Sequence, residues 1–142
     1  FASRSRRDGA GFTLIELLLV LAILAALAVI VVPRLTGHGK KAKIAAAVQG
    51  IGNLEMCLQQ FEIDCDRFPT TNEGLQALIQ NPGVAGWQGP YVKQDTLPMD
   101  PWQNAFQYRS PGSHHADYDL WSFGQDGVDG TEDDITNWTK NQ

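Results

Sequence analysis

An acidic segment near the C-terminal end of the chain holds the side chains best suited to bind an ion. Five carboxylates fall within the nine residues 126–134, and Gly127 and Gly130 interrupt the run. Crowded carboxylates repel one another unless solvent or a cation offsets their charge. Oxygen ligands on a flexible loop suit Ca²⁺, whereas the segment contains no Cys or His for Zn²⁺. The spacing is not that of an EF-hand, because Val128 occupies the place of the second carboxylate ligand. The residues alone indicate a calcium loop and a solvated acidic turn about equally well.

A second polar group, His114, His115, Asp117 and Asp119, precedes this segment. In a strand, alternation would place three of the four side chains on one face, as a metal cluster requires. We favour the alternative, in which these residues form the polar edge of a strand. The sequence shows no Ser/His/Asp or Cys/His arrangement for nucleophilic catalysis, no phosphate-binding loop and no Cys-x-x-Cys motif. We therefore predict no catalytic residue.

Glu16 is a charged residue at one end of an apolar run that extends from Phe12 to Val32. A carboxylate in such a run is costly unless something pairs with it. Thr13 and Glu16 have the spacing of a capping box, in which the Glu side chain accepts a hydrogen bond from a free N–H of the first helical turn. The alternative is that Glu16 pairs with a cation supplied by another molecule.

The apolar run has the length of a membrane span. Its 21 residues contain only two polar side chains, and a helix of that length is roughly 30 Å long. A cleaved secretory signal would be shorter and would end at a small-x-small site, whereas this run ends in Val-Val-Pro-Arg. We therefore predict a transmembrane helix. Basic residues flank the run on both sides, so the positive-inside rule leaves its orientation undecided.

Charge divides the chain of 142 residues, whose formal net charge is −5. Residues 1–43 carry seven basic and two acidic side chains, a balance of +5, whereas residues 44–142 carry four basic and fourteen acidic ones, a balance of −10. An acidic folded part repels phosphate, so we expect no binding to nucleic acid. Together with the apolar run, this asymmetry also argues against a plain soluble globule.

The residues around Glu16 resemble a known processing signal. A basic leader ends at Gly11, and Phe12-Thr-Leu-Ile-Glu16 opens the apolar run. This pattern resembles the class III signal of type IV pilins and pseudopilins. The resemblance implies that a prepilin peptidase cleaves after Gly11, that the new amino terminus on Phe12 is N-methylated, and that Glu16 neutralises the amino terminus of a neighbouring subunit during assembly. Such pairing would cancel two charges that hydrocarbon cannot solvate.

Beyond the apolar run, hydrophobic residues recur between Ile44 and Phe61 at spacings of three and four, which is typical of an amphipathic helix. We expect this helix to end near Asp64. A second capping box at residues 70–73 predicts a short helix that carries Leu75, Leu78 and Ile79. Strand-like segments follow near residues 106–109, 117–123 and 135–138. The pattern predicts an α+β fold in which a long N-terminal helix, part membrane segment and part amphipathic, packs on a small C-terminal antiparallel β-sheet.

The second half of the chain resembles the major pseudopilin of type II secretion systems, the G-type subunit. The resemblance covers nearly the whole chain and implies a pilin-like fold with one Ca²⁺ in loop 122–135. The matching stretches are Phe68-Pro-Thr-Thr71 with Gly74-Leu-Gln-Ala-Leu78, Gly89-Pro-Tyr-Val-Lys93, Leu97-Pro98 with Asp100-Pro-Trp102, Gly124 with Asp126-Gly127, and Asp133-Asp-Ile135 with Asn137-Trp138. By position, the resemblance implies side-chain ligands from Asp126 and Asp133, a further one from Asp134, and backbone carbonyls from Phe123, Val128 and Thr131.

These observations predict a non-enzymatic structural protein with three parts. They are a leader (residues 1–11), a transmembrane and filament-core helix (12–35) and a periplasmic domain (36–142). The resemblance implies a single-pass protein of the bacterial inner membrane that assembles, as a homo-oligomer, into a helical pseudopilus whose growth drives folded proteins across the outer membrane. The partners that it implies are minor pseudopilins, the prepilin peptidase, the inner-membrane assembly platform, the secretin channel and membrane lipid.

Two alternatives differ in kind. A subunit of an adhesive or DNA-uptake type IV pilus would share the N-terminal signal, but pilins of those classes usually close a C-terminal loop with a disulfide. Here Cys57 and Cys65 both precede that region, and they are compatible with a disulfide to each other or with two free thiols. A signal-anchored periplasmic hydrolase with a metal at the acidic loop would not account for the Gly11–Glu16 signal.

Overall fold

The computed structural model describes residues 11–139, and the side chains of residues 29–38 lie outside that description. Except for Gly11, the predicted leader also lies outside the described residues. The chain divides into two compact units, Phe1–Gly39 and Lys40–Gln142. This division falls four residues after the predicted start of the periplasmic domain.

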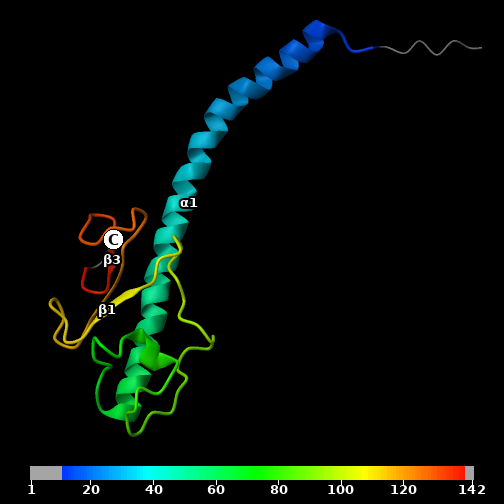
Figure 1. Cartoon of the computed structure of the whole chain (residues 1–142). Coiled ribbons are helices and arrows are strands. Elements are labelled where there is room, and N and C mark those ends of the chain that lie inside the picture. Colours follow the sequence, from blue (N-terminus) through cyan, green and yellow to red (C-terminus); the bar gives the residue numbers. More distant parts are fainter. Residues whose placement is uncertain (1–10, 140–142) are drawn as a thin grey trace, which may run out of the picture. The chain divides into compact units, whose positions relative to one another are not determined.

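Helix α1 runs from Leu14 to Cys65, and its first turns form the N-terminal unit (Figure 1). The large apolar side chains between Phe12 and Leu27 are exposed by half or more, from 50% at Val20 to 82% at Phe12. Among the helical residues with described side chains, no stretch is long and apolar enough to cross a membrane. The predicted membrane segment 12–35 extends into the residues whose side chains lie outside the description, so it stays a prediction.

In the C-terminal unit, one face of α1 forms the centre of the hydrophobic core. The predicted stripe is confirmed at Ile51, Leu54, Leu58 and Phe61, which are at most 4% exposed, and Ile44 packs against the same core. Val48 was predicted wrongly, because it is 42% exposed and its neighbour Ala47 is buried instead. Burial of a large aliphatic or aromatic side chain stabilises a fold by about 1.5–3 kcal/mol. The helix ends one residue later than predicted, and Asp66 then adopts a positive φ of 56°, which turns the chain out of the helical direction.

The predicted short helix after α1 is present in a different form. Helix η1, Leu75–Leu78, is a 3₁₀ helix, and Ile79 caps it rather than belonging to it. The predicted capping box forms at residues 70–73, one turn before η1. The Thr70 N–H donates to Glu73 Oε2 at 2.7 Å, and the Glu73 N–H donates to Thr70 Oγ1 at 3.3 Å. Gly74 then takes a φ of 59°, which separates the capped turn from the helix. Leu75 and Leu78 are buried in the core.

An ion pair fixes the turn that joins α1 to η1. The Arg67 guanidinium donates to both carboxylate oxygens of Glu73, each at 2.7 Å. Hydrogen bonding to Arg67, with help from Thr70, lowers the pKa of Glu73 to about 2. The pairing therefore stabilises the turn above the ordinary pKa of a glutamate and is lost as the pH falls toward 2.

Three short strands form the predicted antiparallel sheet. Strand β1 is Gln107–Arg109, β2 is Asp119–Ser122 and β3 is Ile135–Thr136, in the order β1-β2-β3. Tyr108 lies opposite Leu120, and Ser122 lies opposite Ile135. Each strand is shorter than predicted, because turns that use polar side chains replace its ends. Leu120 and Ile135 belong to the same buried cluster as the α1 stripe, so the α+β prediction is confirmed.

The two cysteines are free thiols in this structure. Both lie on α1 eight residues apart, which corresponds to about 12 Å along a helix, whereas a disulfide requires Cα atoms within about 7 Å. The Cys57 thiol instead donates a hydrogen bond to the Tyr91 carbonyl at 3.2 Å. The disulfide alternative is therefore not formed.

Two glycines of α1 provide a matched test of this packing. An alanine Cβ at Gly50 would lie 2.7 Å from Cζ of the buried Phe106 ring, whereas one at Gly52 would meet nothing within 4 Å. Glycine in a helix interior costs about 0.5–1 kcal/mol relative to alanine. We predict that Gly52→Ala stabilises residues 40–142 by that amount in urea unfolding. Gly50→Ala should destabilise them by about 1–3 kcal/mol through overpacking. Equal stabilisation by both variants would contradict the packing of Phe106 on α1.

Candidate functional site

The first turn of α1 places the residues of the predicted processing signal. Gly11 and Phe12 precede the helix, and Phe12 is 82% exposed. The Thr13 N–H donates to Glu16 Oε2 at 3.4 Å, and the Glu16 N–H donates to Thr13 Oγ1 at 3.3 Å, so the predicted capping box is confirmed. These bonds are long, and Glu16 is exposed. The carboxylate is therefore accessible to a second partner while it caps its own helix.

The acidic loop, residues 123–134, joins β2 to β3. The start and the end of the loop come together at Gly124, where the φ is 68°. A Cβ there would overlap both the carbonyl and the carboxylate of Asp133. The loop closes at this point because glycine leaves that space empty. The sequence resemblance assigned no role to Gly124.

The Asp133 carboxylate organises the inside of the acidic loop. Its Oδ2 accepts hydrogen bonds from the N–H groups of Gln125 at 2.7 Å and Asp126 at 3.0 Å. Its Oδ1 accepts one from the Thr131 hydroxyl at 2.6 Å. The Thr131 hydroxyl and these N–H groups lower the pKa of Asp133 to about 2. Asp133, a predicted Ca²⁺ ligand, thus already accepts hydrogen bonds from the loop itself.

Asp134 contains an unpaired buried atom. Its Oδ2 accepts a hydrogen bond from the Gly130 N–H at 2.7 Å, whereas its Oδ1 is buried without a partner. Among the residues that the structure describes, no other buried side-chain oxygen or nitrogen lacks a partner. An unsatisfied buried carboxylate oxygen costs free energy, and a cation beside it would offset that cost.

Asp126 and Asp129 fix the part of the loop around Val128. Asp126 Oδ1 accepts a hydrogen bond from the Val128 N–H at 2.8 Å. Asp129, which the sequence analysis gave no role, accepts one from the Trp121 indole N–H at 3.0 Å. That bond joins the loop to β2 across eight residues, and no spacing rule predicts it. Phe123 is half-buried at the start of the loop.

The predicted calcium ligands are collected in one loop but do not form a cluster of acidic side chains. Within residues 11–139, as far as side chains are described, no three Asp, Glu, His or Cys residues converge to hold a metal. The Val128 carbonyl lies 3.3 Å from the Thr131 hydroxyl, whose proton goes to Asp133, and the Thr131 carbonyl accepts a hydrogen bond from the Asp134 N–H at 3.3 Å. The donor set that remains for a cation is the free oxygen of Asp134 together with backbone carbonyls, which Ca²⁺ accepts as ligands.

The second polar group is a structural anchor. Asp119 is fully buried, and its carboxylate accepts hydrogen bonds from the N–H groups of Ser113, His114 and His115 at 2.7–3.2 Å. Arg109 pairs with it at 3.1 Å. Burial alone would raise the pKa of Asp119, but these donors outweigh it and hold the pKa below its ordinary value. The carboxylate is thus saturated, which argues against a metal cluster. The predicted strand edge is not formed either, because His114, His115 and Asp117 precede β2 in a bend and Asp119, its first residue, is buried.

Comparison with known proteins identifies the relatives of the chain. The family model of type II secretion system protein G matches residues 34–138, and that of the prokaryotic N-terminal methylation motif matches residues 6–32. The type II secretion system core protein G of Klebsiella michiganensis is 46% identical over 138 residues, which cover 94% of this chain and 96% of that protein. The same protein of Escherichia coli K12 is 45% identical over 131 residues, 90% of each chain.

A solved structure agrees with these relatives. The crystal structure of the major pseudopilin from the type 2 secretion system of enterohaemorrhagic Escherichia coli superposes with a TM-score of 0.65 at 38% identity. The match covers 78% of this chain and 98% of that one. The predicted resemblance is confirmed at the level of sequence and of fold.

The close approach at Gly124 yields a test of the loop geometry. Gly124 and Gly130 both have positive φ, but a Cβ at Gly130 would meet nothing within 4 Å. Alanine at either position carries the cost of a left-handed backbone, about 1–2 kcal/mol. We predict that Gly124→Ala destabilises residues 40–142 by at least about 2 kcal/mol more than Gly130→Ala, because it also displaces Asp133. Urea unfolding in EDTA measures the difference, and equal values for the two variants would contradict the described loop.

Proposed function

This chain belongs to the type II secretion system protein G family, and we propose from this that it is the major structural subunit of a pseudopilus. The observation that carries the proposal is the pair of family matches, which together span residues 6–138. In such a filament many copies of the chain assemble, and growth of the filament drives folded proteins across the outer membrane. The relatives reported above are secretion-system proteins, and they give no support to the alternative of an adhesive or DNA-uptake pilus.

We propose that assembly begins with processing at the amino terminus. A prepilin peptidase would cleave between Gly11 and Phe12, where the chain is exposed and precedes the helix. The new ammonium on Phe12, once methylated, would face the Glu16 carboxylate of a neighbouring copy. The match to the N-terminal methylation motif over residues 6–32 supports this step. Pairing of the two charges in an apolar environment would fix the register between copies.

The exposed apolar surface of the N-terminal unit supports a location in the membrane. Side chains such as Leu14 and Ile15 are 78% and 75% exposed, which is stable only in lipid or against other apolar helices. We propose that the chain is anchored in the inner membrane by residues 12–35, with residues 36–142 in the periplasm. The same surface would then enter the filament core, where copies pack head to tail in an open assembly.

The chain would act by assembling rather than by catalysis. Its partners would be further copies of itself, minor pseudopilins, the prepilin peptidase, the assembly platform and the secretin channel. The family supports this proposal, since its relatives are named as protein G and as the major pseudopilin of type II secretion systems. The polar groups described above serve as helix caps and loop anchors, and Asp119 and Asp133 are saturated by donors.

We propose that the acidic loop binds one Ca²⁺. Asp134 would bind the ion through Oδ1, its buried unpaired oxygen, and backbone carbonyls of the loop at Phe123, Val128 and Thr131 would complete the set with the outer carboxylate of Asp126. Asp133 would orient the loop through its hydrogen bonds to Gln125 and Thr131. The ion would supply positive charge that offsets the crowded carboxylates, and the loop would thereby stay in shape at the surface of the subunit.

Variants of the first turn separate helix capping from intersubunit pairing. Glu16→Gln keeps a side chain that can cap the helix but removes the charge, whereas Thr13→Ala removes the capping hydroxyl and keeps the carboxylate. If Glu16 pairs with the amino terminus of a neighbour, Glu16→Gln should reduce filament recovery and secretion at least about tenfold. Thr13→Ala should remain within about twofold of the parent. Filaments sheared from cells and the secreted fraction of an exported protein measure both effects.

These comparisons require equal amounts of cleaved subunit in the membrane, which an immunoblot provides. Normal assembly by Glu16→Gln, or equal losses in both variants, would show that Glu16 acts only as a cap.

Calcium binding predicts a stability effect with a matched control. A ligand at about 100 times its Kd stabilises a protein by about 2.7 kcal/mol, which corresponds to roughly 10 °C or more in Tm for a domain of this size. We therefore expect residues 40–142 to melt at least several degrees higher in millimolar Ca²⁺ than in EDTA. Asp134→Asn should remove most of this difference. Glu132→Gln, which removes an exposed charge from the same loop, should preserve it. An unchanged Tm in the parent would exclude the calcium loop.

A further inference from the structure

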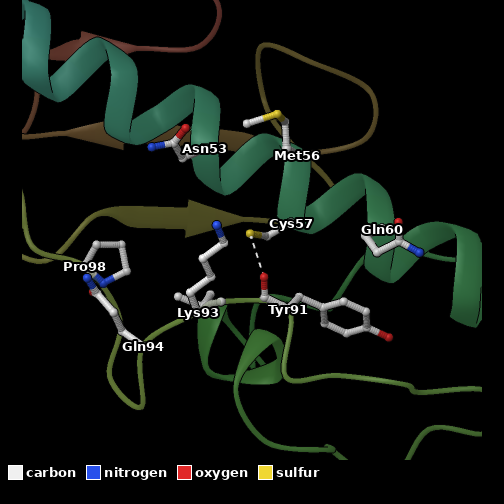
Figure 2. A pocket seen from close by; sticks show the side chains of 9 residues that line it. Asn53, Met56, Cys57, Gln60, Tyr91, Lys93, Gln94 and Pro98 are labelled. Carbon is white, nitrogen blue, oxygen red and sulfur yellow. Dashed lines mark hydrogen bonds between the residues drawn. The ribbon is translucent and has the colours of Figure 1, made fainter.

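A groove opens on the C-terminal unit between α1 and the segment 91–98 that runs alongside it (Figure 2). Its volume is about 490 Å³. Met56 and Cys57 line the helical side of the groove, and Tyr91, Lys93 and Pro98 line the other side. Figure 2 shows Cys57 facing segment 91–98 from the helix. We refer to this feature as the Cys57 groove. It has room for an aliphatic side chain together with the backbone on either side of it.

The floor and the rim of the Cys57 groove differ in chemistry. The Cys57 thiol is held by the Tyr91 carbonyl, and burial raises the pKa of that thiol, so the floor is uncharged. Met56 is 62% exposed beside it, which leaves apolar surface without cover. Lys93 is exposed, extends from segment 91–98 toward α1, and forms no ion pair with any described residue. A complementary occupant would present an apolar side chain with carboxylates next to it.

The acidic loop of the same protein presents such a side chain. Val128 is 55% exposed and is one of the large apolar residues that the C-terminal unit leaves uncovered. Its backbone is held in place, because its N–H donates to Asp126 Oδ1 at 2.8 Å. Asp129 follows it directly and Glu132 lies four residues after it; both are exposed, and neither is a proposed Ca²⁺ ligand. Val128 is therefore a preorganised apolar knob with negative charge beside it in the loop.

Ile63 is a second candidate knob with carboxylates next to it, since it is 71% exposed and lies between Glu62 and Asp64. It lies on α1 itself, seven residues after Met56, and therefore on the same side of the helix as the groove. A contact between Ile63 and the Cys57 groove would be mutual and would close a dimer. Loop 123–134 lies on the other side of α1 from segment 91–98 in Figure 1. When Val128 of one copy binds the groove of another, the pair still has one free Val128 and one free groove. Further copies can then bind at both ends, as an open filament requires.

We propose that the Cys57 groove of one copy receives Val128 of a second copy, with Lys93 facing the carboxylates of the acidic loop. This inference rests on the proposed function, because a filament brings the two surfaces together at high effective concentration. The contact joins the globular units outside the filament core. It also gives the shape of the acidic loop a direct role in how copies bind one another.

Disulfide trapping tests the contact in the full chain, because the groove already contains a thiol. In a Cys65→Ser background, Val128→Cys places one thiol on the knob and leaves Cys57 in the groove. On assembled filaments, copper phenanthroline removes two electrons and two protons from each pair of adjacent thiols. Because every copy carries both partners, we expect a ladder of dimers, trimers and higher oligomers on a non-reducing gel. Ile63→Cys in the same background is the matched control and should give at most a dimer.

Two further variants test the specificity of the ladder. Cys57→Ser should abolish the ladder and leave no product beyond a dimer. Lys93→Glu should reduce ladder formation at least about threefold, because it places like charges at the rim, and Glu132→Lys should restore part of it. A ladder that persists without Cys57, or filaments of normal yield that give no ladder, would overturn the contact and leave the proposed function intact. If the parent chain forms no filaments, the proposed function fails and the contact fails with it.

Discussion

Burial of one face of α1 is the constraint on which the rest of the C-terminal unit depends. The other regular elements are short, since η1 spans four residues and β3 only two. Elements of this length do not persist by their own hydrogen bonds. Leu78 and Leu120 reach 0% exposure because they belong to one cluster with the stripe on α1. The helix therefore provides the surface on which the sheet, the 3₁₀ helix and the loops are arranged.

Buried or hydrogen-bonded carboxylates fix the turns and loops outside the hydrophobic core. Asp119, Asp133 and Glu73 each accept several hydrogen bonds from nearby N–H or O–H groups, and the pKa of each is lowered. The negative charge of residues 44–142 is thus in part structural and is not simply a solvated surface. Asp134 differs from these residues because one of its buried oxygens has no donor. That difference, within a single loop, is what connects the fold to the proposed calcium ion.

The predictable parts of this protein follow from rules that act over a few residues. The spacing of apolar residues located the buried face of α1, and the Thr13–Glu16 pattern identified its cap, because both depend only on helical geometry. The 3₁₀ form of η1 was missed because it depends on the backbone angle of Gly74. The bond between Trp121 and Asp129, and the unpaired oxygen of Asp134, depend on how the acidic loop folds back on itself and on β2. The resemblance predicted which loop would carry the calcium site. Only the fold shows that Asp134 is the carboxylate with a buried oxygen that accepts no hydrogen bond.

The exposed apolar helix and the folded acidic unit would both serve one filament. The intact mass of this chain, recovered from filaments sheared off producing cells, tests that role most directly. The account predicts that the filament fraction contains the chain with a mass that corresponds to residues 12–142 plus one methyl group. Abundant processed chain in the membrane with none in the filament fraction would contradict it, as would filaments built from a chain that still begins before Phe12.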